Sequence, residues 1–157
     1  MLFRSGHAIA KGAFLLLSSD YRIGVEGDYK IGMNEVQIGM TMHHAGIAIA
    51  RAKLSHTYLD RSVNNSEIYN PKEAVKAGFL DVIVPEDQLL PTAIKVAKLF
   101  SQLNAKAHAA TKLKVRKPHL EAIEKAERKS DVYGKSEEHG DGRISKRKSN
   151  HRMNTYS

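Results

Sequence analysis

A turn of small residues leads into an apolar segment near the start of the chain, and a single carboxylate follows a second turn. Residues 6–12 read GHAIAKG, residues 13–17 are all apolar, and Glu35 follows the turn at Gly27 and Asp28. The first N–H groups of a helix have no intrahelical acceptor, so such a turn presents them to whatever lies in front. Backbone N–H groups can stabilise an oxyanion, and a nearby carboxylate can move a proton. The pattern is typical of a site that does both.

The composition indicates one globular domain. The chain has 157 residues, 41% of them hydrophobic, and no cysteine. A chain of this length can bury a substantial core, and the lack of cysteine excludes disulfides, thiolate metal sites and a cysteine nucleophile. No apolar stretch approaches the ~20 residues that a membrane-spanning helix needs, and residues 1–5 are too short for a signal peptide. We therefore expect a cytoplasmic protein without a membrane partner.

The positive charge is concentrated at the C-terminal end. The net charge is +8; residues 1–111 carry 12 Lys/Arg against 10 Asp/Glu, and residues 112–157 carry 13 against 7. The body alone therefore does not indicate a nucleic-acid-binding protein. The basic residues 112–117 and 146–148 have three interpretations: contact with phosphates of a ligand, non-specific attraction of nucleic acid, or a solvated charged end.

Local patterns predict a mixed α/β chain. We expect strands at residues 21–25, 29–31 and 80–84, and helices at 12–18, 42–54 and 57–63. Because residues 13–17 are all apolar, the first helix should be covered on every side. Asn70 followed by Pro71 is a favoured helix start, and Gly78 should end that helix.

The C-terminal third is predicted to be helical and then disordered. A long helix should begin near Glu86 and end at Asn104, followed by helical segments at 105–114 and 119–129 on either side of Pro118. From residue 130 the apolar periodicity disappears. The predicted organisation is therefore a domain over residues 1–129, with its core from about residue 6 and C-terminal helices at about 88–129, and a basic disordered tail over 130–157.

The ordered set of motifs resembles the enoyl-CoA hydratase/isomerase (crotonase) superfamily. The resemblance runs from the small-residue turn through Glu35, Ile38-Gly39 and the small-residue segment 45–52 to the stretch NPKEAVKAGFLDVIVPEDQLL, about residues 6–117. It implies a partial crotonase ββα spiral with C-terminal helices, in which the family's N-terminal third has no counterpart. It also implies an acyl-CoA thioester as substrate, no separate cofactor, and a homo-oligomer, either a trimer or a hexamer.

The resemblance assigns a role to several residues. Glu35 falls on the second family glutamate, which exchanges a proton with a carbon of the thioester, and Lys11 and Gly12 fall on the oxyanion turn. The first family glutamate falls on Phe14, which cannot activate water. A single carboxylate suffices for a double-bond shift, so isomerase chemistry is favoured over hydration. The alternatives are a surface loop for Glu35 and a plain tight turn for Lys11 and Gly12.

Other residues would line the acyl pocket. Adjacent histidines point in different directions and make a poor metal pair, so we expect no metal site at His43 and His44. Asp20 fits a helix-end or turn role better than an acid. The implied pocket residues are Ala8, Ala10, Phe14, Gly39, His43 and His44.

Two further hypotheses remain beside the acyl-CoA enzyme. One is a catalytically inactive crotonase-like remnant that acts at most as an assembly subunit. The other is a basic nucleic-acid-binding protein, which rests on the C-terminal residues alone. Loss of acyl-CoA turnover on substitution of Glu35 would separate the enzyme from the remnant.

Overall fold

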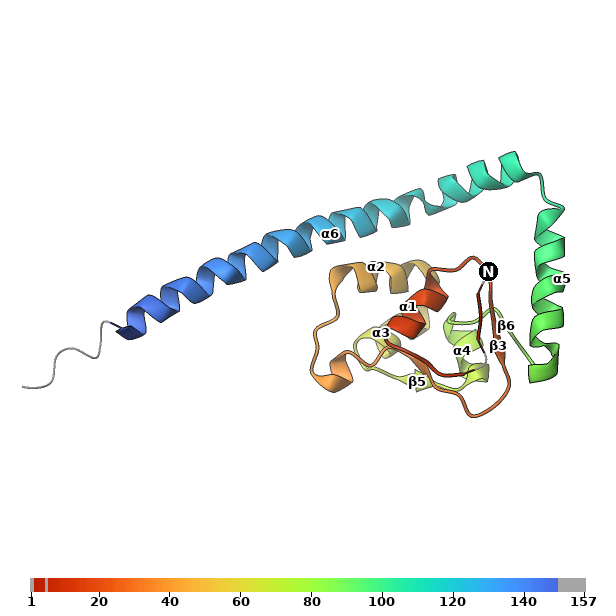
Figure 1. The fold of residues 1–157 in the computed structure, drawn as a ribbon, viewed down its shortest axis with the longest axis horizontal. Helices are drawn as coiled ribbons and strands as arrows, with labels where there is room; N and C mark the ends of the chain where they lie inside the picture. Colours follow the sequence, from red (N-terminus) through yellow and green to blue (C-terminus); the bar gives the residue numbers. More distant parts are fainter. Residues whose placement is uncertain (1, 5, 150–157) are drawn as a thin grey trace, which may run out of the picture.

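Two small three-stranded sheets form the framework of the computed structural model, which describes residues 2–4 and 6–149 and the side chains of residues 6–128 (Figure 1). In the first sheet β3 (Arg22–Val25) lies between β1 (Leu2–Arg4) and β6 (Val82–Val84), and both neighbours are parallel to it. In the second sheet β4 (Ile31–Gly32) pairs in parallel with β2 (Ala8–Ile9) and antiparallel with β5 (Ile68–Tyr69).

Helices connect and cover these strands. The structure contains α1 (Lys11–Leu17), α2 (His44–Lys53), α3 (His56–Val63), α4 (Pro71–Ala77), α5 (Leu89–Ser101) and α6 (Ala105–Ser149), with 3₁₀ turns η1 (Val36–Ile38) and η2 (Glu86–Gln88). The start and end of α4 are confirmed: the N–H of Glu73 donates to Asn70 Oδ1 at 2.9 Å, and Gly78 adopts the left-handed conformation with φ 94°. Among the described residues, no helix is both long and apolar enough to cross a membrane.

The main core forms around α1. Leu16 and Leu17 of α1 are buried together with Met33, Phe79 and Leu80. A second, smaller cluster lies between β3 and α5; its buried members are Ile23, Val25, Leu89 and Ala93. Since apolar burial is the main driving force for folding, α1 is fixed in place by its inner face.

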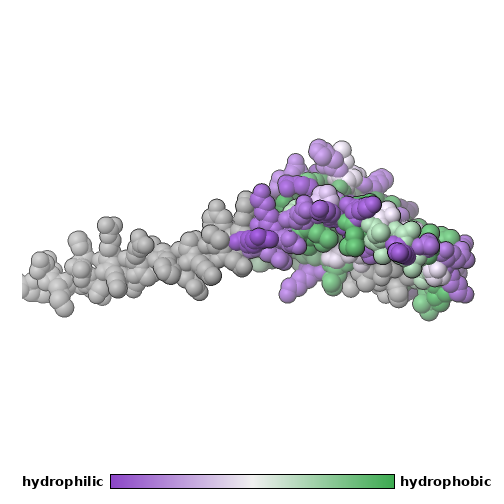
Figure 2. All heavy atoms as spheres, turned by 90° about the horizontal axis from the view of Figure 1, so that it is seen from above, coloured by the Kyte–Doolittle hydropathy of each residue, from purple (hydrophilic) through white to green (hydrophobic). Residues whose placement is uncertain are grey.

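The outer face of α1 corrects one prediction. Leu15 is 63% exposed, so the apolar run is not covered on every side. Further apolar side chains are exposed after Glu35, at Val36, Ile38 and Met40. Figure 2 shows hydrophobic side chains in green among hydrophilic ones in purple on the face seen from above.

The C-terminal region is one helix where two segments and a tail were predicted. α6 runs from Ala105 to Ser149 with Pro118 inside it, packs against α2 and extends away from the body (Figure 1). A proline removes the hydrogen bond to the carbonyl four residues earlier, here that of Lys114, and Lys114 is exposed so that water can replace the bond. The predicted tail thus begins as helix, and its residues 150–157 lie outside the described part of the chain.

Asn104 has a different role from the predicted one. α5 ends at Ser101, and Asn104 Oδ1 accepts a hydrogen bond from the N–H of Ala107 at 3.0 Å. Asn104 therefore caps the start of α6 instead of ending α5. A short polar residue between two helices can end the first helix or cap the second. Which of the two it does depends on the path of the chain after it.

Candidate functional site

The paired strands β2 and β4 bring the small-residue turn and the Glu35 segment together. The N–H of Ala8 donates to the carbonyl of Lys30 at 2.8 Å, and the N–H of Ala10 donates to the carbonyl of Gly32 at 3.1 Å. Because the strands are parallel, their carboxyl ends lie at the same edge of the sheet. β2 continues directly into α1, and β4 continues into the loop that contains Glu35.

The start of α1 has a strained residue and N–H groups without an intrahelical acceptor. Ala10 precedes the helix with φ 51° and ψ −115°, and no side chain caps this end. The carbonyl of Ala10 accepts hydrogen bonds from Ala13 at 2.9 Å and Phe14 at 3.1 Å. The N–H groups of Lys11 and Gly12 come before these donors, where a helix offers them no acceptor. The positive φ falls on Ala10 and not on Lys11.

The side chain of Glu35 is buried, and one of its carboxylate oxygens makes no hydrogen bond. It is 8% exposed, and its Oε2 has no hydrogen-bond partner. Its backbone carbonyl accepts from Ile38 at 3.2 Å and Met40 at 2.8 Å, which closes the loop around η1. A buried carboxylate oxygen without a donor is unusual, because the energetic cost of removing it from water is not offset. Such a group is available for a ligand or a transferred proton.

Ser66 supports this loop, and sequence reasoning missed it. The N–H of Gln37 donates to Ser66 Oγ at 3.1 Å, and Ser66 is buried with φ 52°. The residue follows Asn64 and Asn65, a pattern that predicts a turn but not a contact with residues 29 positions earlier. No signal in the sequence could have identified it.

Phe14 and His43 join the starts of α1 and α2. Their ring centroids are 5.3 Å apart, and His43 Nδ1 accepts a hydrogen bond from the N–H of Gly46 at 2.8 Å. Phe14 is half-buried, and His43 is exposed beside the buried Met42. The position that the resemblance gives to the first family glutamate is therefore occupied by Phe14, whose ring contacts His43.

The remaining predicted pocket residues lie in different places. Ala8 is fully buried within β2, and Gly39 ends η1 with φ 80° beside a hollow lined by Met40 and Met42. His44 lines another hollow, between α2 and α6, with Arg51 and His119. His44 thus lies toward α6, whereas His43 contacts Phe14. Within the described residues, no group of three His, Cys, Asp or Glu side chains could hold a metal ion.

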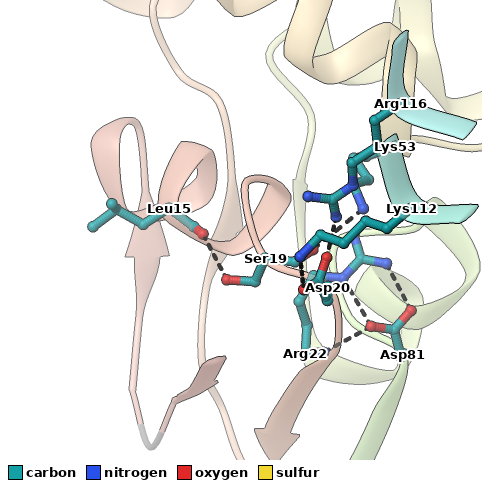
Figure 3. Close-up of polar contacts among 8 residues, drawn as sticks. All are labelled: Leu15, Ser19, Asp20, Arg22, Lys53, Asp81, Lys112 and Arg116. Carbon is teal, nitrogen blue, oxygen red and sulfur yellow. Dashed lines mark hydrogen bonds and ion pairs between the residues drawn. The ribbon is translucent and has the colours of Figure 1, made fainter. Parts of the chain in front are cut away.

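A charged network beyond the C-terminal end of α1 fixes α6 to the body (Figure 3). Asp20 accepts a hydrogen bond from Lys112 at 2.6 Å and pairs with Arg116. The hydrogen bond from Lys112, together with the charge of Arg116, lowers the pKa of Asp20. Two cations of the basic segment 112–117 therefore have an intramolecular partner, which the sequence could not reveal across 92 residues.

The same network extends to Lys53. Its Nζ donates to the carbonyl of Ser19 at 3.2 Å. Desolvation by burial, with the charges of Arg116 and Arg22 adding to it, lowers the pKa of Lys53. This region is a structural contact between α1, α2 and α6, separate from the edge that carries Glu35.

Comparisons with known proteins match most of the chain. The family described as "Enoyl-CoA hydratase/isomerase" matches residues 4–152. Human mitochondrial enoyl-CoA delta isomerase 1 is 29% identical over 114 residues, which are 72% of this chain and 38% of that protein. The chain thus spans less than half the length of this curated relative.

Solved structures confirm the predicted crotonase-like α/β fold. An enoyl-CoA hydratase/isomerase family protein from Pseudomonas syringae has a TM-score of 0.76 and 55% identity, covering 77% of this chain and 53% of that one. A probable enoyl-CoA hydratase from Mycobacterium tuberculosis H37Rv has a TM-score of 0.77 and 36% identity, covering 85% of this chain and 56% of that one.

Proposed function

Because this chain belongs to the enoyl-CoA hydratase/isomerase family, we propose that it carries the proton-transfer part of an acyl-CoA site and shifts a double bond in a CoA thioester. The observation that carries this proposal is the buried carboxylate of Glu35 with its unpartnered Oε2. The pairing of β2 with β4 supports it, because this carboxylate and the start of α1 follow the same sheet edge. Coenzyme A belongs to the substrate, and no further cofactor is part of the proposal.

Each group has one step in the proposed reaction. The Glu35 carboxylate takes a proton from the carbon next to the thioester carbonyl, and the electrons of the C–H bond form an enolate. The N–H groups of Lys11 and Gly12 stabilise the negative oxygen, which is typically worth ~10²–10³ in rate for one such donor. Glu35 then returns the proton at the far end of the conjugated system. Phe14 offers no base for water, so isomerisation is favoured over hydration.

The test is turnover of a 3-enoyl-CoA by the purified chain, followed through the absorbance of the conjugated 2-enoyl product. Glu35→Gln should lower the rate by about 10²–10⁴, the usual contribution of a general base. Glu26→Gln removes an exposed carboxylate after β3 and serves as the control. Unchanged turnover in Glu35→Gln would contradict the proposal.

A second candidate is a non-catalytic subunit that assembles with other chains. It is favoured by the apolar side chains around the Glu35 loop, where Val36, Ile38 and Met40 are 45%, 60% and 57% exposed. Such a patch suits burial against protein, in a homo-oligomer such as a trimer or hexamer or against another chain. A thermal-shift titration with acetyl-CoA and crotonyl-CoA separates the two, because a ligand of the folded state raises the unfolding midpoint. A midpoint indifferent to both favours the assembly subunit.

A further inference from the structure

Lys53, the last residue of α2, lies at the wall of a hollow between α1, α2 and α6. The hollow has a volume of about 220 Å³, and its lining includes the apolar side chains of Leu17, Ile49 and Ile123. Pockets for drug-sized ligands measure about 300–1,000 Å³, so this hollow is too small for a whole coenzyme A thioester. It has room for a small apolar group such as a short acyl chain.

The amine of Lys53 has a neutral hydrogen-bond acceptor. Its Nζ donates to the carbonyl of Ser19 at 3.2 Å, and the side chain is half-buried. Within residues 6–128, no carboxylate forms an ion pair with this amine. A half-buried ammonium without an ion-pair partner loses hydration that a single carbonyl does not replace. The surroundings therefore favour the neutral amine over the charged one.

The charges around Lys53 add to this preference. Desolvation by burial, with the charges of Arg116 and Arg22, lowers the pKa of Lys53, while two carboxylates act in the opposite direction. Both carboxylates are already engaged by other cations. Figure 3 shows Lys53 among these pairs, which are Asp20 with Lys112 and Arg116, and Asp81 with Arg22.

An amine in such a place is suited to attack a carbonyl carbon. A lysine becomes nucleophilic when it is desolvated in an apolar pocket or lies next to another cation, and Lys53 has both conditions. We propose that Lys53 is a modification site that takes the acyl group from a short-chain acyl-CoA, with the acyl chain in the hollow between α1, α2 and α6. The choice of acyl-CoA as the reagent rests on the proposed function, but the step uses neither Glu35 nor the start of α1.

The reaction exchanges a thioester for an amide. The nitrogen of the neutral amine attacks the thioester carbonyl carbon and forms a C–N bond, and the C–S bond breaks. Coenzyme A leaves as a thiolate and takes up the proton that the nitrogen releases. The resulting amide keeps one N–H, which can still donate to the carbonyl of Ser19. The modified residue has no charge, so one cation is removed from the neighbourhood of Arg116 and Arg22.

The test is incubation of the purified chain with butyryl-CoA, with the acylation of each lysine followed by peptide mass spectrometry. Lys76 is an internal control, because it is exposed and pairs with Glu73, which raises its pKa. Lys53 should react faster than Lys76 by about tenfold or more, since the unprotonated fraction changes tenfold for each pH unit between two pKa values. In a pH series, the rate at Lys53 should level off at a lower pH than the rate at Lys76. A rate at Lys53 no higher than at Lys76 overturns the proposal.

The role of the hollow is tested by the length of the acyl chain. Butyryl-CoA should modify Lys53 faster than acetyl-CoA does, by about fourfold for each CH₂ group that enters the hollow. The exposed Lys76 should show no such preference. The same rate at Lys53 with both thioesters means that the chain does not enter the hollow, and this result overturns its placement there.

Two variants confirm the site. Lys53→Arg keeps a cation that can donate to the carbonyl of Ser19 but has no acylable amine, so the first adduct in the intact mass should disappear. Lys76→Arg is the matched control and should keep that adduct. An adduct that persists in Lys53→Arg at the wild-type rate overturns the assignment.

The outcomes separate this inference from the function on which the reagent rests. Butyryl-CoA has no double bond to shift, so acylation by it is independent of isomerisation. Selective acylation of Lys53 without 3-enoyl-CoA turnover supports the inference and contradicts the proposed function. Turnover that depends on Glu35, without selective acylation of Lys53, supports the proposed function and overturns the inference.

Discussion

The N–H of Ala10 and the carbonyl of Gly32 lie 3.1 Å apart, and this hydrogen bond joins the two segments that carry the proposed chemistry. Ala10 is the residue before α1, and Gly32 is three residues before Glu35. The relative position of the α1 N–H groups and the Glu35 carboxylate therefore depends on how closely β2, β4 and β5 pack.

Gly32→Ala should disturb this packing. An added Cβ would lie 2.8 Å from the carbonyl oxygen of Glu67 and 3.0 Å from Ile68 Cδ1. Because a backbone oxygen cannot move aside easily, we expect the free energy of unfolding to fall by about 1–3 kcal/mol, measured by urea denaturation. Gly6→Ala is the control, since no atom lies within 4 Å of its added Cβ. Equal stability of the two variants would contradict this description of the site.

Ala10→Gly should act in the opposite direction. Ala10 has φ 51° and ψ −115°, which an L-residue adopts only with strain. Glycine relieves that strain, and we expect the free energy of unfolding to rise by about 1 kcal/mol. Ala13→Gly, inside α1 and fully buried, should instead lower it, because glycine is unfavourable within a helix. If both variants are destabilised equally, Ala10 is not strained in solution.

Local chemistry explains which elements could be predicted. The cap of Asn70, the proline after it and the glycine at position 78 are neighbours in sequence, and the structure confirms all three in α4. The turn before α1 and the strand at β3 were likewise predicted from adjacent residues. The resemblance to a family, confirmed by the comparisons, supplied the overall fold that local patterns alone do not determine.

The missed features depend on contacts between distant residues. β5 has only two residues and is defined by its pairing with β4. A run of apolar residues does not indicate which face of the helix stays exposed to solvent, so the exposure of Leu15 was not predicted. Ser66 and the partners of Asp20 are set by tertiary structure alone. Residues that could do chemistry could therefore be proposed from the sequence, but the contacts between distant residues that hold them in place could not.

Asp81→Ala should be strongly destabilising. Arg22 donates from Nε and one terminal nitrogen to the two oxygens of Asp81, at 2.9 and 2.6 Å, and from the other to the carbonyl of Gly78 at 2.6 Å. The Arg22 side chain is only 7% exposed, whereas Asp81 is 29% exposed. Removal of the carboxylate leaves a buried cation without its partner, so we expect a loss of about 3 kcal/mol, the low end for buried pairs.

Asp28→Ala is the control for that experiment, because Asp28 is an exposed carboxylate in the loop after β3. Urea denaturation of both variants measures the difference. An Asp81→Ala protein as stable as the Asp28→Ala protein would show that water reaches the guanidinium of Arg22.

Asp20→Asn should loosen α6 in a pH-dependent way. Lys112 and Arg116 lower the pKa of Asp20 below its ordinary value of 3.8, so the folded state favours the ionised form. The ion pair therefore stabilises the folded state fully at a pH above the ordinary pKa of Asp20. This stabilisation is lost as the pH falls through the lower pKa that Asp20 has in the folded state. At neutral pH the variant should show faster hydrogen exchange where α6 packs on α2, and the difference should shrink in strong acid.

High salt and a control variant test whether the effect of Asp20→Asn on α6 is electrostatic. High salt should reduce the difference between wild type and Asp20→Asn, since the pair is partly exposed and screened. Glu121→Gln, which removes an exposed partner of Lys117 on the same helix, should leave the exchange of α6 unchanged. A pH-independent difference would mean that Asp20 fixes α6 through packing and not through charge.

Glu35→Gln should stabilise the chain while it removes turnover. Oε2 of Glu35 is buried without a hydrogen-bond partner, and burial of an ionised oxygen costs more than burial of a neutral amide. We expect the free energy of unfolding to rise by about 1 kcal/mol at neutral pH. Sites that keep a strained or unsatisfied group for function often gain stability when that group is removed.

Glu67→Gln provides the contrast in the same part of the fold. Glu67 pairs with Arg61 at 2.9 Å on the surface, so its loss should leave stability unchanged or slightly lower. Urea denaturation of both variants, with turnover measured on the same samples, tests the relationship. A destabilised Glu35→Gln protein would mean that the carboxylate has a favourable partner in solution, and Glu35 would then be a structural residue with no oxygen free to move a proton.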